Sequence, residues 1–500
     1  MNGILLAVPA LLPIVGGTAI LASGYGAGDE RTYRHLEIVV EGLVLLNSLL
    51  VALLIAGRSG MDNGLVLFKL YGNLTVRFKL DSVFAGLVAF LWPLATLYSF
   101  EYMRHEKRRA SFFAYYLMTY GVTIGIAFSG NLVTMYLFYE LLTLVTFPLV
   151  LHPMTKEAMR ASRKYLYYSI GGAAFAFIGL IFVLKYSATG TTEFVPGGVL
   201  SLTAAEGDRG TLLFVYILAF FGFGVKAAVF PCHGWLPKAT VAPTPVTALL
   251  HAVAVVKSGA FAILRFTYFS YGTEFLRGSA AQWVVMAAAM VTIIFGSTMA
   301  VKEIHWKRRL AYSTISNLSY ILLGASMMSP LGLAAALSHM VFHAFMKICS
   351  FFCAGAVMHQ TGKTYVYEVD GLAKKMPLTF GCLTVASLSS VCRFYQQMEH
   401  CGSGLRLRQS RSGRRQQNGN SPVSGNGCDP LFGPDDRCLY AYCAGAGVFS
   451  KGCGRRRGKR GTVHRSQLDD DGAASDLRGR SAGVWPVFRA SDGVAYGDRR

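Results

Sequence analysis

The stretch VKAAVFPCHGWLPKATVAPTPVTALLHAVAVVKSGAFAILRF, at residues 225–266, decides the fold, because it places single charges and helix breakers inside apolar sequence. Lys226 and Lys257 stand in aliphatic runs, and Pro231 and Pro237 interrupt the first run. A proline removes a backbone donor and breaks a helix, and a charge at mid-bilayer needs a partner or water. Transporters place ion sites on such irregular backbone. The stretch therefore predicts a polytopic membrane protein with a broken helix.

Apolar runs long enough to cross a bilayer recur on both sides of this stretch. Hydrophobic residues make up 53% of the chain and charged residues 15%. Met1–Ser23 has no basic n-region, so it is expected to be a first span and not a cleavable signal peptide. The fold class is all-α, with about eleven complete spans predicted at 1–23, 33–56, 80–101, 112–129, 131–153, 165–187, 211–231, 242–267, 281–300, 310–328 and 331–358, and a truncated twelfth from about 377.

The connecting loops give an orientation. Only the loops after spans 3, 5, 9 and 11 are basic, whereas the loop after span 6 holds Glu193, Glu206 and Asp208. Basic loops favour the cytoplasm, so the N-terminus is predicted to lie outside the cell membrane. The basic residues are Arg104, Lys107, Arg108, Arg109, Lys156, Arg160, Arg163, Lys164, Lys302, Lys307, Arg308, Arg309, Lys363, Lys374 and Lys375.

Glu140 is a further charge at membrane depth, near the middle of MYLFYELLTLVTF. A buried ammonium group loses hydration and holds its proton less tightly unless a carboxylate lies near it. We therefore expect Glu140 to pair with Lys226 and to control how tightly Lys226 holds its proton. A purely structural buried salt bridge is the alternative. His233, on the predicted break, has two open interpretations: a relay group or a hydrogen-bonded cap.

Histidines accompany the lysines in the later spans. His251 precedes Lys257, and LSHMVFHAFMKICSFF sets His339, His343 and Lys347 at i, i+4 and i+8. This spacing gives one stripe along a helix, whereas a metal site needs converging ligands. The stripe favours a proton relay; static hydrogen bonding between helices and metal binding are the alternatives.

Four blocks of sequence, taken together, closely resemble one transporter family. They are the stretch at 225–266, LFYELLTL at 137–144, KRRLAYSTISNLSYILLG at 307–324 and SHMVFHAFMKICSFFCAGAVMH at 338–359. The family contains the antiporter-like subunits of respiratory complex I, of membrane-bound hydrogenases and of multisubunit Mrp-type cation/proton antiporters. The resemblance covers about residues 1–390, and the wording FYELLTLVTFPLVLH favours an MrpD-like member.

The resemblance implies fourteen helices with two inverted repeats of five. Here these are residues 112–267 and a truncated 281–390, after three helices in 1–111. By position, Glu140, Lys226 and Lys257 match the family's proton-carrying residues, and the His339–Lys347 stripe falls on its central polar axis. Such proteins move protons, or exchange them for Na⁺, beside other membrane subunits. No sequence motif for NAD, flavin or iron–sulfur binding is found, so neither a cofactor nor nucleic acid is expected to bind, and any redox chemistry is expected from partner subunits.

The tail at 391–500 has a different character. It holds 19 Lys and Arg against 10 Asp and Glu, seventeen of the basic residues being Arg, and it lacks isoleucine. Large apolar residues are too few for a core, so disorder is expected. A nucleic-acid patch at RRRGKR and a zinc site among its cysteines are weaker interpretations, because the first lacks interleaved aromatics and the second lacks a CxxC pair.

A shifted reading frame explains the tail. One permitted codon choice for Val391–Cys401 reads SAGFISKWNIA when the first base is dropped, and Met398–Glu399 forces its Trp. The resemblance leads us to expect this wording at a second broken helix. We therefore predict a frameshift product from about residue 391. The chain would then be either a proton-translocating subunit or, without the lysine of that helix, a non-transporting fragment or scaffold.

Overall fold

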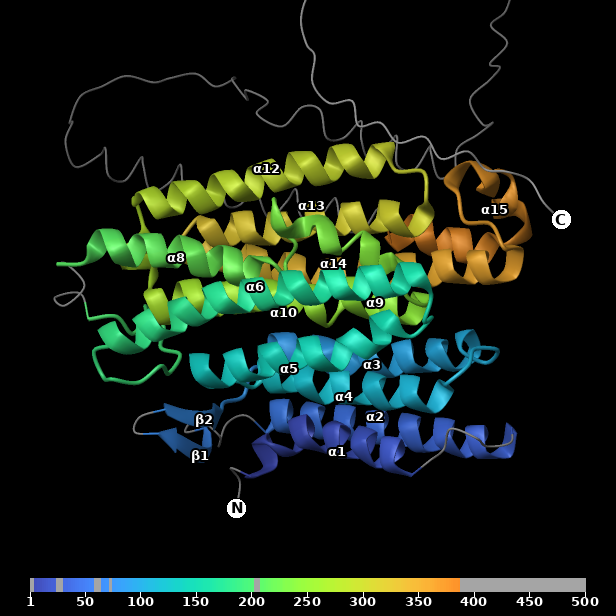
Figure 1. Cartoon of the computed structure of the whole chain (residues 1–500), viewed down its shortest axis with the longest axis horizontal. Helices are drawn as coiled ribbons and strands as arrows, with labels where there is room; N and C mark the ends of the chain where they lie inside the picture. Colours follow the sequence, from blue (N-terminus) through green and yellow to red (C-terminus); the bar gives the residue numbers. More distant parts are fainter. Residues whose placement is uncertain (1–3, 24–29, 58–63, 72–73, 202–206, 387–500) are drawn as a thin grey trace, which may run out of the picture. The chain divides into compact units, whose positions relative to one another are not determined.

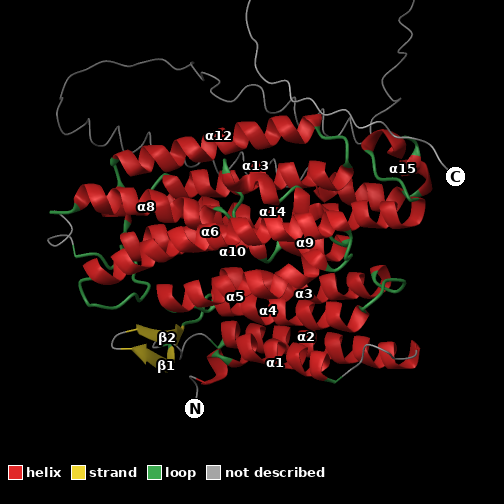
Figure 2. Ribbon diagram, in the orientation of Figure 1, coloured by secondary structure: helices red, strands yellow, loops and turns green. Residues whose placement is uncertain are grey.

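The computed structural model describes residues 4–23, 30–57, 64–71, 74–201 and 207–386, and these residues are mostly helical (Figure 2). Each of the eleven predicted spans contains helix. The predicted twelfth begins with the short helix Pro377–Ala386. The tail from residue 391, with its predicted frameshift and disorder, lies outside the described residues.

Eight helical segments among the described residues are long and apolar enough to cross a membrane, and Val8–Ala22, Arg209–Gly224 and Pro377–Ala386 are shorter apolar helices. The protein is therefore a multi-pass membrane protein. The main helices, labelled in Figure 1, are α1 (Val8–Ala22), α2 (Glu30–Ala56), α3 (Val83–Tyr102), α4 (Arg109–Ala127), α5 (Leu132–Leu151), α6 (Lys156–Tyr186), α8 (Arg209–Gly224), α9 (Thr244–Ala252), α10 (Val255–Arg265), α12 (Ala280–Lys302), α13 (Trp306–Ser326) and α14 (Pro330–Thr361).

Side-chain caps set the start of several helices. The side-chain carbonyl oxygen of Asn131 accepts from Thr134 N–H at 2.8 Å before α5, and Thr155 Oγ1 accepts from Ala158 N–H at 3.1 Å before α6. Ser329 Oγ accepts from Gly332 N–H at 3.0 Å, and Pro330 follows at the first position of α14. Each cap satisfies a donor that the first turn leaves unpaired.

A β-hairpin corrects the prediction that the chain is all-α. Strands β1 (Leu65–Tyr71) and β2 (Leu74–Phe78) pair antiparallel, with Leu65 opposite Phe78 and Lys69 opposite Thr75. Apolar and polar residues alternate strictly from Leu74 to Phe78, and the most buried residues of β2 are Val76 and Phe78. This period of two indicates a half-buried strand. The segment is too short to be recognised by an analysis based on membrane-spanning length.

Backbone hydrogen bonds connect the residue after β2 with the segment after α4, and that segment in turn with the segments that follow α6 and α10. Lys79 N–H donates to Phe128 O at 2.7 Å, Phe194 N–H to Gly130 O at 3.1 Å, and Val195 N–H to Phe269 O at 3.2 Å. At the opposite end of the helices, where the basic loops lie, Trp306 N–H donates to Thr364 O at 3.1 Å. The hairpin and α15 (Leu372–Lys375) lie at opposite ends of the helices (Figure 1). This grouping agrees with the predicted alternation of loops, while the side that faces the cytoplasm stays a prediction.

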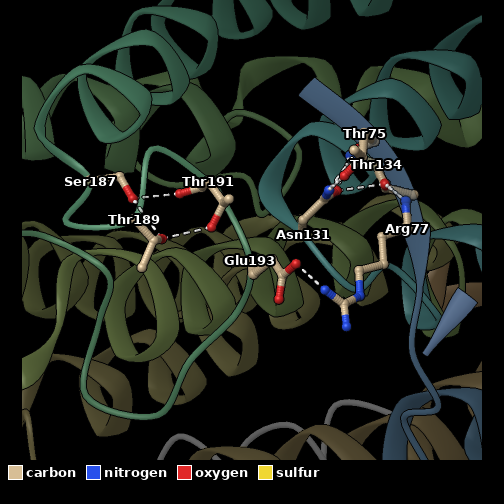
Figure 3. A network of polar contacts seen from close by, with 8 residues as sticks. All are labelled: Thr75, Arg77, Asn131, Thr134, Ser187, Thr189, Thr191 and Glu193. Atoms are coloured by element: carbon tan, nitrogen blue, oxygen red, sulfur yellow. Dashed lines mark hydrogen bonds and ion pairs between the residues drawn. The ribbon is translucent and has the colours of Figure 1, made fainter. Parts of the chain in front are cut away.

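Polar side chains strengthen the hairpin end (Figure 3). Arg77 forms an ion pair with Glu193, and Asn131 Nδ2 donates to Thr75 O at 2.7 Å. Arg265, in the last turn of α10, pairs with Asp81 at 2.8 Å between Nη2 and Oδ2. Its guanidinium also lies over the rings of Phe194, Phe261 and Phe269. These contacts fix the end of α10, the helix that carries Lys257.

Candidate functional site

The segment after α8 is irregular, as the prolines predicted, but the helix ends earlier than expected. It stops at Gly224, so Lys226 lies on the non-helical link and not within a helix. Short 3-10 helices follow at Cys232–Trp235 and Lys238–Val241. Trp235 Nε1 donates to Val225 O at 2.8 Å, and the same carbonyl accepts from Ala228 N–H at 3.1 Å, so both bonds tie the irregular segment together.

Lys226 is held against the middle of α5. Its side chain is 1% exposed, and its Nζ lies 3.9 Å from Glu140 Oε1. The ammonium group also donates to the backbone carbonyl of Tyr139, and Nζ sits 3.4 Å from the centre of the Tyr139 ring. The Glu140 side chain is 29% exposed, and its Oε1 makes no hydrogen bond to a described residue. The structure thus brings Glu140 and Lys226 together, but through a loose ion pair.

A close approach of α10 supports this arrangement. A Cβ atom on Gly259 would lie 2.5 Å from Ala227 N and 3.0 Å from Lys226 Cβ. Only a residue without a side chain lets the helix backbone reach the link at this distance. Gly259 therefore helps to fix the backbone that presents Lys226.

The predicted span 242–267 is also interrupted, which the sequence did not reveal. α9 ends at Ala252 and α10 begins at Val255, and the N–H groups of Val253 and Ala254 both donate to Leu249 O, at 3.2 and 2.9 Å. Neither proline nor glycine marks this point. His251 lies just before the interruption and Lys257 one turn after it, so the two side chains belong to different helices.

Lys257 meets the histidine stripe of α14. Its Nζ lies 2.9 Å from His343 Nδ1, and both side chains are 0% exposed. The rings of His339 and His343 stack with centroids 6.0 Å apart and planes at 18°. This contact joins two of the predicted site residues across helices that are distant in sequence.

The remaining site residues lie in different surroundings. Lys347 Nζ donates to Ser313 Oγ at 2.8 Å and to Leu310 O at 3.3 Å, both on α13. His251 is fully buried, packs its ring 4.9 Å from that of Phe351, and forms no hydrogen bond with a described residue. His251 is therefore held by packing and not by a hydrogen bond to a described residue.

His233 sits in an aromatic setting on the broken segment. Its ring stacks on Phe230 at 5.5 Å and lies 4.5 Å from Phe295, measured between centroids. Among the described residues, neither an ion pair nor a hydrogen bond links it to Lys226 or Lys257. Pro231 and Pro237 flank it as the residues that precede the two 3-10 turns.

Two residues of this site escaped the sequence analysis, namely Tyr139 and Ser313. Tyr139 precedes Glu140 and supplies both a carbonyl and a ring to Lys226, and Ser313 binds Lys347. The polar run AYSTISNLS in an otherwise apolar span was the available signal for Ser313. Within the residues that the structure describes, no group of three or more His, Cys, Asp or Glu side chains is placed to hold a metal ion.

Fold and site define a class: a polytopic helical membrane protein whose interior holds lysines and histidines next to interrupted helices. Residues 129–393 match the family described as NADH:quinone oxidoreductase/Mrp antiporter, TM. This match covers more than half of the chain, so the chain belongs to that family.

The relatives include both antiporter subunits and NADH-quinone oxidoreductase subunits. The A/B component of a probable K⁺/H⁺ antiporter of Rhizobium meliloti is 36% identical over 61% of this chain and 30% of its own length. NADH-quinone oxidoreductase subunit N of Desulforudis audaxviator is 34% identical over 61% of this chain and 60% of its own length. The chain thus spans less than two thirds of either relative.

Solved structures share the fold. A chain of the membrane-bound sulfane sulfur reductase, an archaeal respiratory membrane complex, matches with a TM-score of 0.68 at 22% identity, over 88% of this chain and 86% of that one. A chain of the Mrp complex from Dietzia sp. matches with a TM-score of 0.65 at 23% identity, over 78% and 71%. At these identities the likeness concerns the fold alone.

Proposed function

We propose that this chain is a proton-translocating subunit of a multisubunit membrane assembly, either an Mrp-type cation/proton antiporter or a complex I-like oxidoreductase or hydrogenase. Protons pass along buried side chains, and partner subunits supply any redox chemistry. The observation that carries the proposal is the 2.9 Å contact between Lys257 Nζ and His343 Nδ1. Both groups can exchange a proton, both are fully buried, and they lie on different helices within hydrogen-bond distance. Proton transfer between two such groups is the elementary step of a relay.

The path that we propose begins at the Glu140–Lys226 pair and continues through Lys257 to the histidines of α14 and to Lys347. An amine and an imidazole can each give up and accept a proton, and Ser313 beside Lys347 can donate and accept. His251, next to the interruption before α10, is assigned to the path, and His233 is proposed as a neighbour of it. The residues assigned to it are Glu140, Lys226, His251, Lys257, His339, His343 and Lys347.

The finer architecture is part of the same proposal. We assign eleven complete spans, an inverted-repeat relation between 112–267 and 281–390, an outside N-terminus and a place in the cell membrane. In the first repeat an interrupted segment follows α8, and we expect its counterpart in the second repeat to begin after Pro377–Ala386, outside the described residues. The partners are the other membrane subunits of the assembly, and the transported ions are protons with Na⁺ as the candidate counter-ion.

A second candidate function is a fragment or scaffold that assembles without transport. It rests on the frameshift that we propose near Val391, and the family match ends next to that position, at residue 393. In this case the lysine expected in the second broken helix is missing from the chain.

Expression of two versions would test both candidates. The chain with its present sequence and a version with its frame restored at codon 391 would each be produced with partner subunits in an antiporter-deficient bacterium. Proton movement in inverted vesicles and growth in Na⁺ would then be measured. We expect transport from the restored version only, and its loss on Lys226→Ala. Full transport by Lys226→Ala would contradict the path, and equal transport by both versions would refute the need for the missing lysine.

A further inference from the structure

Glu41 is a buried carboxyl group outside the path described above. It lies near the middle of α2, and both of its carboxylate oxygens are buried without a hydrogen bond to any described residue. α2 belongs to the first three helices, before the first proposed repeat. An ionisable group inside a membrane-spanning helix usually has a functional reason, because burying it is costly.

A second observation at the same place is Asn47. Its side chain is 0% exposed, and neither Oδ1 nor Nδ2 forms a hydrogen bond with a described residue. The indole N–H of Trp92 is buried and makes no hydrogen bond with a described residue, and the buried hydroxyl of Tyr116 lies near Ser99. Buried polar atoms are seldom left unpaired, so a cluster of them indicates a site that handles a polar species.

Together with their polar neighbours these groups make up what we call the α2 polar stripe: Glu41, Asn47, Ser48, Trp92, Tyr116 and Tyr120. The Trp92 ring lies 5.4 Å from that of Tyr116 and stacks at 4.9 Å on that of Tyr120. The Tyr116 hydroxyl is close enough to Glu41 to interact with it electrostatically. Tyr120 Oη is 2.8 Å from Ser48 Oγ and also lies near Asn47.

The stripe has a direction along the helices. Glu41 and Ser48 are seven residues, or two turns, apart on α2. Tyr116 and Tyr120 are four residues, or one turn, apart on α4. α2 leads toward β1, and the end of α4 at Phe128 is bonded to Lys79 after β2. The stripe therefore runs from Glu41 toward the hairpin end of the membrane domain.

Among the described residues, Glu41 has no positively charged partner that would balance the charge of its carboxylate. No described Lys, Arg or His side chain forms an ion pair with it, and the Arg109 guanidinium lies over the ring of Tyr33, two turns earlier on α2. Helix α1 carries no titratable residue between Val8 and Ala22. Helices α3 and α4 also pack against α2 and carry titratable groups, as does the turn of α2 before Glu41. These groups are Tyr98, Glu101 and Tyr102 of α3, Arg109, Tyr115, Tyr116 and Tyr120 of α4, and Glu37 of α2.

We propose that Glu41 is a second proton-binding site of this protein, and that the α2 polar stripe carries the proton between Glu41 and the hairpin end. An unpaired carboxylate costs several kcal/mol in a medium of low dielectric, whereas a carboxylic acid can be neutral there and both donate and accept. The stripe suits a proton better than Na⁺, because Trp92 Nε1–H and the Asn47 amide offer N–H donors at positions where a cation needs oxygen ligands. The site stands apart from Lys226 and Lys257 and goes beyond the function proposed above.

A hydrophobic carbodiimide tests this on the full chain in lipid vesicles, because the reagent modifies protonated carboxyl groups in apolar surroundings. We expect a Glu41 adduct in the peptide map at about neutral pH, weaker labelling as the pH is raised, and the same labelling in Na⁺ and K⁺. Glu101, whose side chain is 79% exposed, is the internal control and should stay unmodified.

Infrared spectroscopy provides the second readout. Glu41→Gln should remove one protonated carboxyl C=O band that titrates with pH, Tyr116→Phe should shift it, and Glu101→Gln should leave it in place. An unlabelled Glu41 together with an unchanged spectrum in Glu41→Gln would overturn the proposal. Selective protection by Na⁺ would also overturn it, in favour of a sodium site. If Glu41→Gln does not fold, the peptide map and Tyr116→Phe still decide. Neither readout depends on transport through Lys226, so this proposal and the proposed function can fail separately.

Discussion

Lys257 Nζ and His343 Nδ1 lie 2.9 Å apart, although 86 residues separate them in sequence. The contact depends on two local features. Lys257 stands one turn after the interruption between α9 and α10, and the far end of α10 is fixed by the ion pair between Arg265 and Asp81. The relay that we propose therefore depends on how firmly α10 is held.

Replacing Lys257 or His343 should slow proton movement strongly in the frame-restored protein. We expect Lys257→Ala and His343→Ala each to lower the transport rate by about a hundredfold, since a positioned proton-transfer group commonly contributes a factor of this size. The rate of dye-reported acidification in vesicles measures the effect. Lys185→Ala is a matched control, because this lysine lies at the end of α6 over the ring of Tyr186. Unchanged transport in His343→Ala would contradict the relay.

Removing one member of the Glu140–Lys226 pair should destabilise the fold more than removing both. Breaking a buried pair leaves an uncompensated group and costs about 3–5 kcal/mol, whereas loss of both partners costs less. Thermal unfolding in detergent of Glu140→Gln, Lys226→Met and the double variant would measure the coupling. Because Glu140 is partly exposed and the atoms are 3.9 Å apart, we expect a value at the low end of this range. Strict additivity of the two single effects would contradict the pairing.

Gly259 should resist substitution. A Cβ atom there would overlap Ala227 N, so Gly259→Ala must shift either α10 or the link that carries Lys226. We expect a loss of stability of about 1–3 kcal/mol, together with impaired transport. Gly171→Ala on α6 is the control, since no atom lies within 4 Å of the added methyl group. Equal behaviour of the two variants would show that the close approach does not matter.

Arg265→Leu tests how the end of α10 is held. The change leaves Asp81 without its partner and removes contacts with three aromatic rings. We expect a loss of about 1–3 kcal/mol and faster hydrogen exchange in 265–272. Arg104→Ala, which breaks an exposed pair with Glu101 at 3.9 Å, should change stability by less than about 1 kcal/mol. If the two variants behaved alike, the Asp81 contact would have no structural role.

The sequence predicted the helices well because long apolar runs with charged ends have few alternatives in a membrane. It also indicated the interruption after α8, through Pro231 and Pro237, and the partnership of Glu140 with Lys226. It did not predict the interruption at Val253, since no residue there forces it and only tertiary packing selects it. The hairpin was missed because five alternating residues are a weak signal beside a twenty-residue span. Glu41 was overlooked because its unpaired state depends on neighbours from α3 and α4.

The bond from Lys226 to the carbonyl of Tyr139 has a consequence for how this lysine can work. A main-chain carbonyl accepts a hydrogen bond from an amine and from an ammonium group alike. The anchor of Lys226 therefore survives a change of charge, whereas its attraction to Glu140 does not. In the path that we propose, the Lys226 side chain therefore stays in place while it binds and releases a proton, and the Glu140 carboxylate is the group that can move.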